Sequence, residues 1–329
     1  MRRLKYTVSR WPLQKAFVIS RGAITEAEVI QVMTMDGHHQ GFAECVPYAR
    51  YNESIESVSA QIDSVVQAIS NGASRLDIQT LLPAGAARNA VDCALWDLES
   101  KQLGTSAGKL SGLGDPTSLT SAQTISIGSE EEMAAEARQF ANYPLLKVKL
   151  DNENIVSRIA VIHENAPQSN IIIDANEAWS ITDLNSHWRT LMAHNVVLIE
   201  QPLAASDDDA LRCYRGDIPI CADESCHTSA DISGLADRYH AINIKLDKTG
   251  GLTEAIATYE MARKHKLHIM IGCMVGTSLA MAPATLLAQH AEIVDLDGPA
   301  LLAEDVSHGF HFHQGHMSAL SSQLWGGAK

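Results

Sequence analysis

LLKVKL, residues 145–150, is a short apolar run that carries two lysines. Its length and composition indicate a buried strand, and because side chains alternate along a strand, Lys147 and Lys149 share one face. If the sheet is parallel and covered by helices, its outer face offers a lysine no solvent. We therefore expect both ammonium groups to point inward, near the end of the strand.

Seven similar apolar runs accompany this one, spaced roughly 22 to 26 residues apart. Stretches of helical period separate them, for example residues 130–143 and 251–265. This order is typical of parallel βαβ units, and eight units close a barrel. We predict an α/β fold with a modified TIM-type (β/α)7β barrel over residues 119–303. A doubly wound open sheet is the alternative, but no GxGxxG follows the first run. The runs are 122–127, 145–150, 170–175, 196–201, 218–223, 241–246, 267–272 and 292–297.

The first 118 residues have a different pattern. AEVIQVMT (27–34) and HHQGFAEC (38–45) suggest an antiparallel meander, and a helical pattern follows. The segment 87–104 places apolar residues on one helical stripe and ends at Gly104, a residue suited to a helix C-terminus. We predict an N-terminal α+β capping domain over residues 1–118, to which residues 304–329 return.

Composition limits the possible partners and compartment. The 329 residues carry a net charge of −14 spread along the chain, so nucleic acid and anionic membranes are poor partners. No apolar run approaches the roughly 18 residues of a membrane span, and we expect a cytoplasmic protein, which could form a homo-oligomer. The six cysteines include no CxxC pair and are expected to be reduced thiols.

Three carboxylates end consecutive predicted strands. Asp174 ends IIID, Glu200 ends VVLIE and Asp223 ends IPICAD. The carboxyl ends of barrel strands meet at one mouth, so these groups would lie close together and repel unless a cation held them. Each could instead cap the following helix, but Glu is a poor N-cap. We predict a site for Mg²⁺, with Mn²⁺ as a possible substitute.

The lysines suggest a reaction. Lys245 ends the sixth strand, across the barrel from Lys149. A carboxylate bound to Mg²⁺ has a more acidic α-proton, and one lysine can remove that proton while the other returns one to the opposite face, through an enediolate. The stereocentre then inverts. We expect Lys147 to lower the pKa of Lys149 and to contact the substrate carboxylate.

This set of residues resembles the enolase superfamily, specifically its muconate-lactonizing subgroup. The resemblance covers nearly the whole chain and is carried by six motifs: AARNAVDCALWDL, IDANEAW, IEQPL, ICADESCH, INIKLDKTGGLTEA and DLDGP. Within the subgroup the chain looks most like the L-Ala-D/L-Glu epimerases of murein peptide breakdown. The resemblance implies an isomerase with Asp174, Glu200 and Asp223 as Mg²⁺ ligands and with Lys149 and Lys245 as the two acid/base groups.

It also implies how a dipeptide would bind. Asp295 and Asp297 match the D-x-D pair that holds the substrate ammonium, and Arg21 is the candidate for the glutamate side chain, ahead of Arg50. Cys273 and Met274, after the seventh strand, are expected to wall the substrate. Supporting roles are open for Asn176 and Glu224, and the alternating histidines 308, 311, 313 and 316 are not expected to bind a metal.

Other functions remain open from sequence. Muconate lactonization, o-succinylbenzoate synthesis and N-acylamino acid racemization would use the same metal and lysines, but their substrates lack a free ammonium. A class I aldolase also has a buried barrel lysine, yet it has no use for three metal-binding carboxylates. A non-catalytic barrel is the third alternative.

Overall fold

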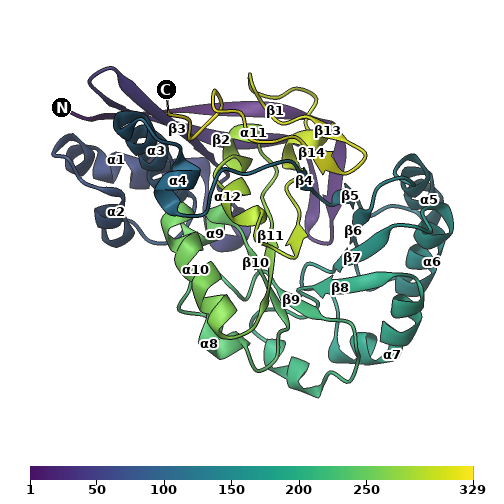
Figure 1. Ribbon diagram of the computed structural model, residues 1–329. Helices are drawn as coiled ribbons and strands as arrows, with labels where there is room; N and C mark the ends of the chain where they lie inside the picture. The colour runs from purple at the N-terminus through teal and green to yellow at the C-terminus, as the bar shows by residue number, and fades with distance from the viewer. Residues whose placement is uncertain (329) are drawn as a thin grey trace.

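Eight parallel strands form the barrel that the apolar runs predicted. In the computed structural model, which describes residues 1–328, they neighbour one another in chain order from β5 to β12 (Figure 1). The N–H of Ala122 donates to the carbonyl of Val294 at 2.8 Å and so links the two ends of the sheet. The fold prediction is confirmed. The strands are β5 (Gln123–Ile125), β6 (Leu145–Lys149), β7 (Asn170–Asp174), β8 (Val196–Glu200), β9 (Ile220–Ala222), β10 (Ala241–Ile244), β11 (His268–Ile271) and β12 (Ile293–Val294).

The pleat of the strands separates an apolar outer layer from a polar mouth. Leu146 and Val148 of β6 are fully buried and belong to the large core that the surrounding helices share. Inside the barrel a smaller apolar cluster includes Ile172, Leu198 and Met270. Because side chains alternate, residues in line with this cluster but nearer the carboxyl ends of the strands face the mouth.

The connections between strands vary in regularity. Four of them carry helices of ten or more residues: α5 (Glu130–Gln139), α6 (Ile155–Asn165), α7 (Ile181–Ala193) and α10 (Leu252–Lys264). Shorter elements complete the ring: η2 (Asp208–Cys213), α8 (Ile232–Leu235), α9 (Leu246–Thr249), α11 (Ser278–Met281), α12 (Thr285–Ala288) and η3 (Gly298–Leu301). Ser129 and Ser180 each form a capping box, so α5 and α7 begin where local sequence directs.

The N-terminal part is the antiparallel meander that the sequence predicted, followed by helices. The central helix, α3, packs on the sheet so closely that a Cβ at Gly41 would lie 2.1 Å from the carbonyl oxygen of Ala94. Only glycine fits there. The elements are β1 (Arg3–Ile19), β2 (Gly22–Asp36), β3 (His39–Cys45), η1 (Ala49–Tyr51), α1 (Ile55–Ser70), α2 (Arg75–Leu81), α3 (Ala86–Leu103) and α4 (Ala107–Ser111).

The last described residues run back to α3 (Figure 1). The indole N–H of Trp325 donates to the carbonyl of Cys93 at 3.1 Å, and the N–H of Gly326 donates to Asp97 at 2.7 Å. On the way, β13 (Phe312–His313) and β14 (His316–Met317) form a hairpin that pairs with β4 (Leu119–Thr120). Trp325 is 1% exposed, so this segment is part of the core.

Within residues 1–328, no helix has the length and apolar character needed to cross a membrane. In the same residues the cysteines are free thiols, and four of the six are buried.

Buried carboxylates join the cap to the barrel. Asp92 of α3 accepts from the hydroxyl and the N–H of Thr253 in α10, at 2.6 and 2.9 Å. Glu44 of β3 accepts from the N–H and hydroxyl of Thr277, at 2.8 and 2.7 Å. Burial raises the pKa of Asp92 to about 7, although the hydrogen bonds from Thr253 oppose this. The interface is therefore sensitive to protonation.

We predict that Asp92→Asn changes the pH dependence of stability. At pH values between its ordinary pKa and about 7, Asp92 takes up a proton when the chain folds. Its stabilising contribution is therefore present at low pH and is lost as pH rises through 7. As pH rises from 5 to 8, the free energy of unfolding of the variant should increase by about 2 to 3 kcal/mol relative to that of wild type. Urea unfolding at both pH values measures this, and an equal stability difference at both would contradict it.

Candidate active site

A cavity of about 730 Å³ lies where the barrel mouth meets loops of the cap. Its floor comes from the barrel and carries most of the charged groups. The cap contributes an apolar and aromatic side together with two arginines. The lining from the barrel includes Thr124, Lys147, Lys149, Asn176, Asp223, Glu224, Lys245, Cys273, Met274, Asp295 and Asp297, and that from the cap includes Phe17, Ile19, Arg21, Tyr48, Arg50 and Tyr51.

The sheet register brings the predicted metal ligands to one height. Lys149 lies opposite Asp174, and Asp174 lies opposite Glu200 on the next strand. Asp223 follows the end of β9 by one residue. The three carboxylates are buried, with exposures of 0%, 0% and 1%. Consecutive strands of a parallel barrel thus place three carboxylates together.

Lys147 lies among these carboxylates. Its ammonium is 2.7 Å from Glu200, 2.7 Å from Asp295 and 3.1 Å from Asp174. Burial lowers the pKa of Lys147, but the three carboxylates outweigh this and raise it well above its ordinary value. Lys147 is therefore a cation that holds the acidic groups together. Its suggested effect on the pKa of Lys149 stays a prediction.

Lys149 and Lys245 approach the cavity from opposite sides, because β6 and β10 are four strands apart in an eight-stranded barrel. Lys149 donates to Asp174 and Lys245 donates to Asp223, each at 2.6 Å. Burial raises the pKa of Asp174, but the ammonium groups of Lys149 and Lys147 lower it below its ordinary value. Each lysine thus lies against one predicted metal ligand, with the cavity between them.

Asp295 and Asp297 follow β12 and are both buried. Asp297 accepts from the N–H of Thr124 at 2.7 Å, while the Oδ1 atom of Asp295 has no hydrogen-bond partner among the residues described. Burial and the neighbouring Asp295 raise the pKa of Asp297 to about 7. Asp295 and Asp297 can therefore accept a hydrogen bond from a positively charged donor.

The donor set fits a hard divalent cation. Burial raises the pKa of Glu200 to about 7, and the negative charges of Asp174 and Asp223 add to the effect. The positive charges around Glu200 therefore do not fully compensate the three carboxylates. In residues 1–328 no three acidic, histidine or cysteine side chains already converge as a metal site. Three buried carboxylates offer the oxygen ligands that Mg²⁺ prefers.

Sequence reasoning missed two residues that hold the predicted ligands. Lys248, fully buried in α9, donates to Oδ1 and the carbonyl of Asp223 at 2.7 and 2.6 Å. Asn243 donates to Glu200 at 2.6 Å. Both lie in INIKLDKTGG, but nothing local distinguishes Lys248 from a surface lysine on a short helix. Only the packing of α9 beneath the mouth reveals it.

We predict that Lys248→Met lowers the free energy of unfolding by about 3 kcal/mol, because it leaves a buried carboxylate without one of its cations. Lys264→Met, on the exposed face of α10, is the matched control and should change stability by less than about 0.5 kcal/mol. Urea denaturation measures both. Equal effects of the two variants would show that Lys248 is not a buried charge partner.

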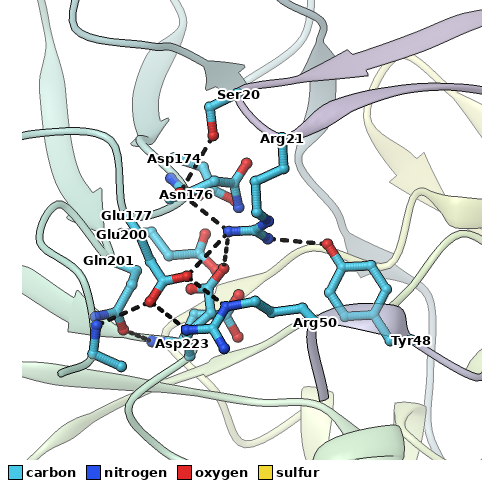
Figure 2. A network of polar contacts seen from close by, with 12 residues as sticks. Ser20, Arg21, Tyr48, Arg50, Asp174, Asn176, Glu177, Glu200, Gln201 and Asp223 are labelled. Carbon is cyan, nitrogen blue, oxygen red and sulfur yellow. Dashed lines mark hydrogen bonds and ion pairs between the residues drawn. The ribbon is translucent and has the colours of Figure 1, made fainter. Parts of the chain in front are cut away.

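The two candidate arginines both contact Glu177 but differ in how they are held (Figure 2). Arg21, in the turn between β1 and β2, donates to the hydroxyl of Tyr48 at 3.0 Å and lies 2.9 Å from Glu224. Arg50 of η1 uses two nitrogens on Glu177, both at 2.8 Å. Arg50 is thus already held by a fork of hydrogen bonds, which favours Arg21 as the group that meets a substrate.

The remaining predicted residues lie at or beside the cavity. Cys273 and Met274 line it, and burial raises the pKa of the Cys273 thiol, which disfavours a nucleophile. The N–H of Asn176 donates to Asp174 at 3.0 Å, so Asn176 supports a predicted ligand. His313 and His316 flank the turn of the β13–β14 hairpin.

Comparison with known proteins identifies the family. Residues 1–114 match the "Mandelate racemase / muconate lactonizing enzyme, N-terminal domain" family, and residues 132–323 match "Enolase C-terminal domain-like". The chain belongs to the enolase superfamily. The family prediction from sequence is confirmed, as is the prediction of an isomerase of the racemase and epimerase class.

Two curated relatives match over most of their length. An N-acetyl-D-glutamate racemase of Pseudoalteromonas sp. is 48% identical over 91% of this chain and 96% of its own. An L-Ala-D/L-Glu epimerase of Escherichia coli is 45% identical over 96% of this chain and 99% of its own.

Two solved structures are also similar. One is an enolase family member from Agrobacterium tumefaciens with homology to dipeptide epimerases, with bound sodium, L-Ala-L-Glu and an ordered loop. Its TM-score is 0.97, with 44% identity over 99% of this chain and 100% of its own. The other is a dipeptide epimerase from Methylococcus capsulatus complexed with Mg and L-Arg-D-Lys, with a TM-score of 0.86 and 28% identity over 96% of each chain.

Proposed function

We propose that this protein inverts the α-carbon of the glutamate residue in L-Ala-D/L-Glu dipeptides. The observation that carries the proposal is the placement of Lys149 and Lys245 on opposite strands with buried carboxylates between them. Relatives bearing epimerase and racemase names support the reaction class, and the Agrobacterium protein that holds L-Ala-L-Glu supports the substrate. Breakdown of murein peptides is the proposed setting.

Asp174, Glu200 and Asp223 would hold Mg²⁺, with Mn²⁺ as a possible substitute, as the Mg-containing Methylococcus structure suggests. When bound, such a cation stabilises the negative charge that develops on a carboxylate when its α-proton leaves. Lys147, already within 3.1 Å of three carboxylates, would remain protonated and contribute a fixed positive charge to the same region.

The remaining residues would bind and move protons. Asp295 and Asp297 hold the dipeptide ammonium, and Arg21 holds the side-chain carboxylate. One of Lys149 and Lys245, as a free amine, takes the α-proton at its Nζ atom. The other, as an ammonium, delivers a proton to the opposite face of the same carbon. Their placement on opposite strands makes inversion the outcome.

We predict that L-Ala-L-Glu gains deuterium at the glutamate α-carbon as it epimerizes in deuterated water with Mg²⁺. Lys149→Ala and Lys245→Ala should each lower the rate of epimerization by about 10³-fold or more, because general acid–base groups contribute at this scale. Proton NMR and polarimetry follow exchange and inversion separately.

Loss of one lysine removes the group serving one face, so single-face exchange can persist in one enantiomer while inversion stops. An active Lys149→Ala enzyme would contradict the two-lysine mechanism. Absence of deuterium uptake with every Ala-Glu isomer would exclude the dipeptide substrate.

N-Acylated glutamate is a second candidate, favoured by the 48% identical N-acetyl-D-glutamate racemase. The two substrate classes differ at the amino group, which the buried Asp295 and Asp297 would meet. N-Propionyl-L-glutamate is L-Ala-L-Glu without its ammonium and therefore tests this difference alone. A buried carboxylate left without its donor costs a few kcal/mol.

We predict that kcat/KM for L-Ala-L-Glu exceeds that for N-propionyl-L-glutamate and N-acetyl-L-glutamate by about 100-fold or more. Asp295→Asn should reduce this preference by acting mainly on the dipeptide. Comparable kcat/KM values for wild type on all three would favour the N-acyl substrate.

A further inference from the structure

Glu177 is a half-buried barrel residue that the mechanism above does not use. It follows β7 and, like Asn176, has a left-handed backbone, with φ values of +71° and +44°. Such a conformation is uncommon outside glycine and persists where surrounding contacts impose it. Here the N–H of Glu177 donates to the carbonyl of Gln201 at 2.9 Å, and its carboxylate accepts from the N–H of Ala205 at 2.9 Å. Glu177 is thus fixed to the barrel at both backbone and side chain.

Two segments of the cap converge on this one carboxylate (Figure 2). Arg50 meets both oxygens of Glu177 at 2.8 Å in a fork, the strong geometry for this pair. Arg21, from the β1–β2 turn, lies 3.4 Å from the Oε2 atom of the same carboxylate. The side chain of Glu177 is 10% exposed and that of Arg50 is 40% exposed, so solvent reaches the pair from the side of the arginine. Arg50 anchors Glu177, and Glu177 in turn faces Arg21.

The position of Arg21 depends on these neighbours. Its Nη1 atom also donates to the carbonyl of Asn176 at 3.1 Å, and its Nη2 atom donates to Tyr48. On the other side lies Glu224, whose side chain is 1% exposed, 2.9 Å from Nη1. Both oxygens of Glu224 lack a hydrogen-bond partner among the residues described. Arg21 thus lies between two carboxylates, and without Glu177 its remaining carboxylate partner in the described residues would be Glu224.

We propose that Glu177, held by Arg50, is a specificity-determining positioning residue that orients Arg21 to receive the side-chain carboxylate of the substrate. The inference rests on the proposed function for the substrate class. A long side chain that is ordered in advance loses less rotamer entropy on binding.

The test compares two dipeptides of nearly equal shape, L-Ala-L-Glu and L-Ala-L-Gln. Glu177→Gln should raise KM for L-Ala-L-Glu by about 10- to 100-fold, with kcat changed little, and should leave L-Ala-L-Gln unaffected. Arg50→Gln should act in the same direction. The double variant should be no worse than the more damaging single one, because the two residues act as a unit.

Asp237→Asn is the matched control. Asp237 also receives two nitrogens of one arginine, Arg212, although both donate to the single oxygen Oδ2, at 2.8 and 2.7 Å, on an exposed part of the barrel. Asp237→Asn should leave KM and kcat unchanged for both dipeptides. A second readout is independent of turnover: backbone amides of residues 19–22 should exchange hydrogen faster in Glu177→Gln, while those of β6 and β7 keep their protection.

Three outcomes would overturn the proposal: an equal loss on both dipeptides, no loss on either, or a loss in Arg50→Gln far larger than in Glu177→Gln, which would make Arg50 the carboxylate receptor. A wild type that epimerizes no Ala-Glu isomer would instead overturn the proposed function. In that case the exchange rates at residues 19–22 decide whether Glu177 holds the Arg21 turn.

Discussion

The ammonium of Lys147 lies within 3.1 Å of carboxylates from three separate strands or strand ends, Asp174, Glu200 and Asp295. Three such groups concentrated at a barrel mouth repel one another, and burial makes the repulsion stronger because the local dielectric is low. A fixed cation among them lets β7, β8 and the segment after β12 end at the same place. Lys149 and Lys245, the proposed acid/base groups, lie on either side of that arrangement.

The same constraint explains why the site is surrounded by further cations. Lys149 and Lys245 each meet one of the predicted metal ligands, and Lys248 secures Asp223 from below. A bound divalent ion would compete with ammonium groups for these oxygens, and that competition would release Lys149 and Lys245 toward a substrate. The same lysines and carboxylates would thus serve both the stability of the fold and the proposed reaction.

The cap completes the cavity instead of merely covering it. Arg21 and Arg50 both reach the barrel at Glu177, so the proposed recognition of a substrate side chain would be shared between two parts of the chain that are far apart in sequence. The buried carboxylates Asp92 and Glu44 hold the same two parts together at a distance from the mouth. Rigid docking at these contacts would allow the turn bearing Arg21 to be positioned with little freedom.

The sequence by itself determined the barrel, because eight β-branched apolar runs at even spacing have few other ways to be buried. It also determined the candidate ligands and lysines, since a strand end is visible in a local pattern and barrel strand ends share one mouth. Only the tertiary structure decided that Lys147 bridges carboxylates, that Lys248 is buried and that Glu177 unites Arg21 with Arg50. Those contacts join residues up to 156 positions apart. Their energies depend on burial and on exact neighbours, which no local pattern records.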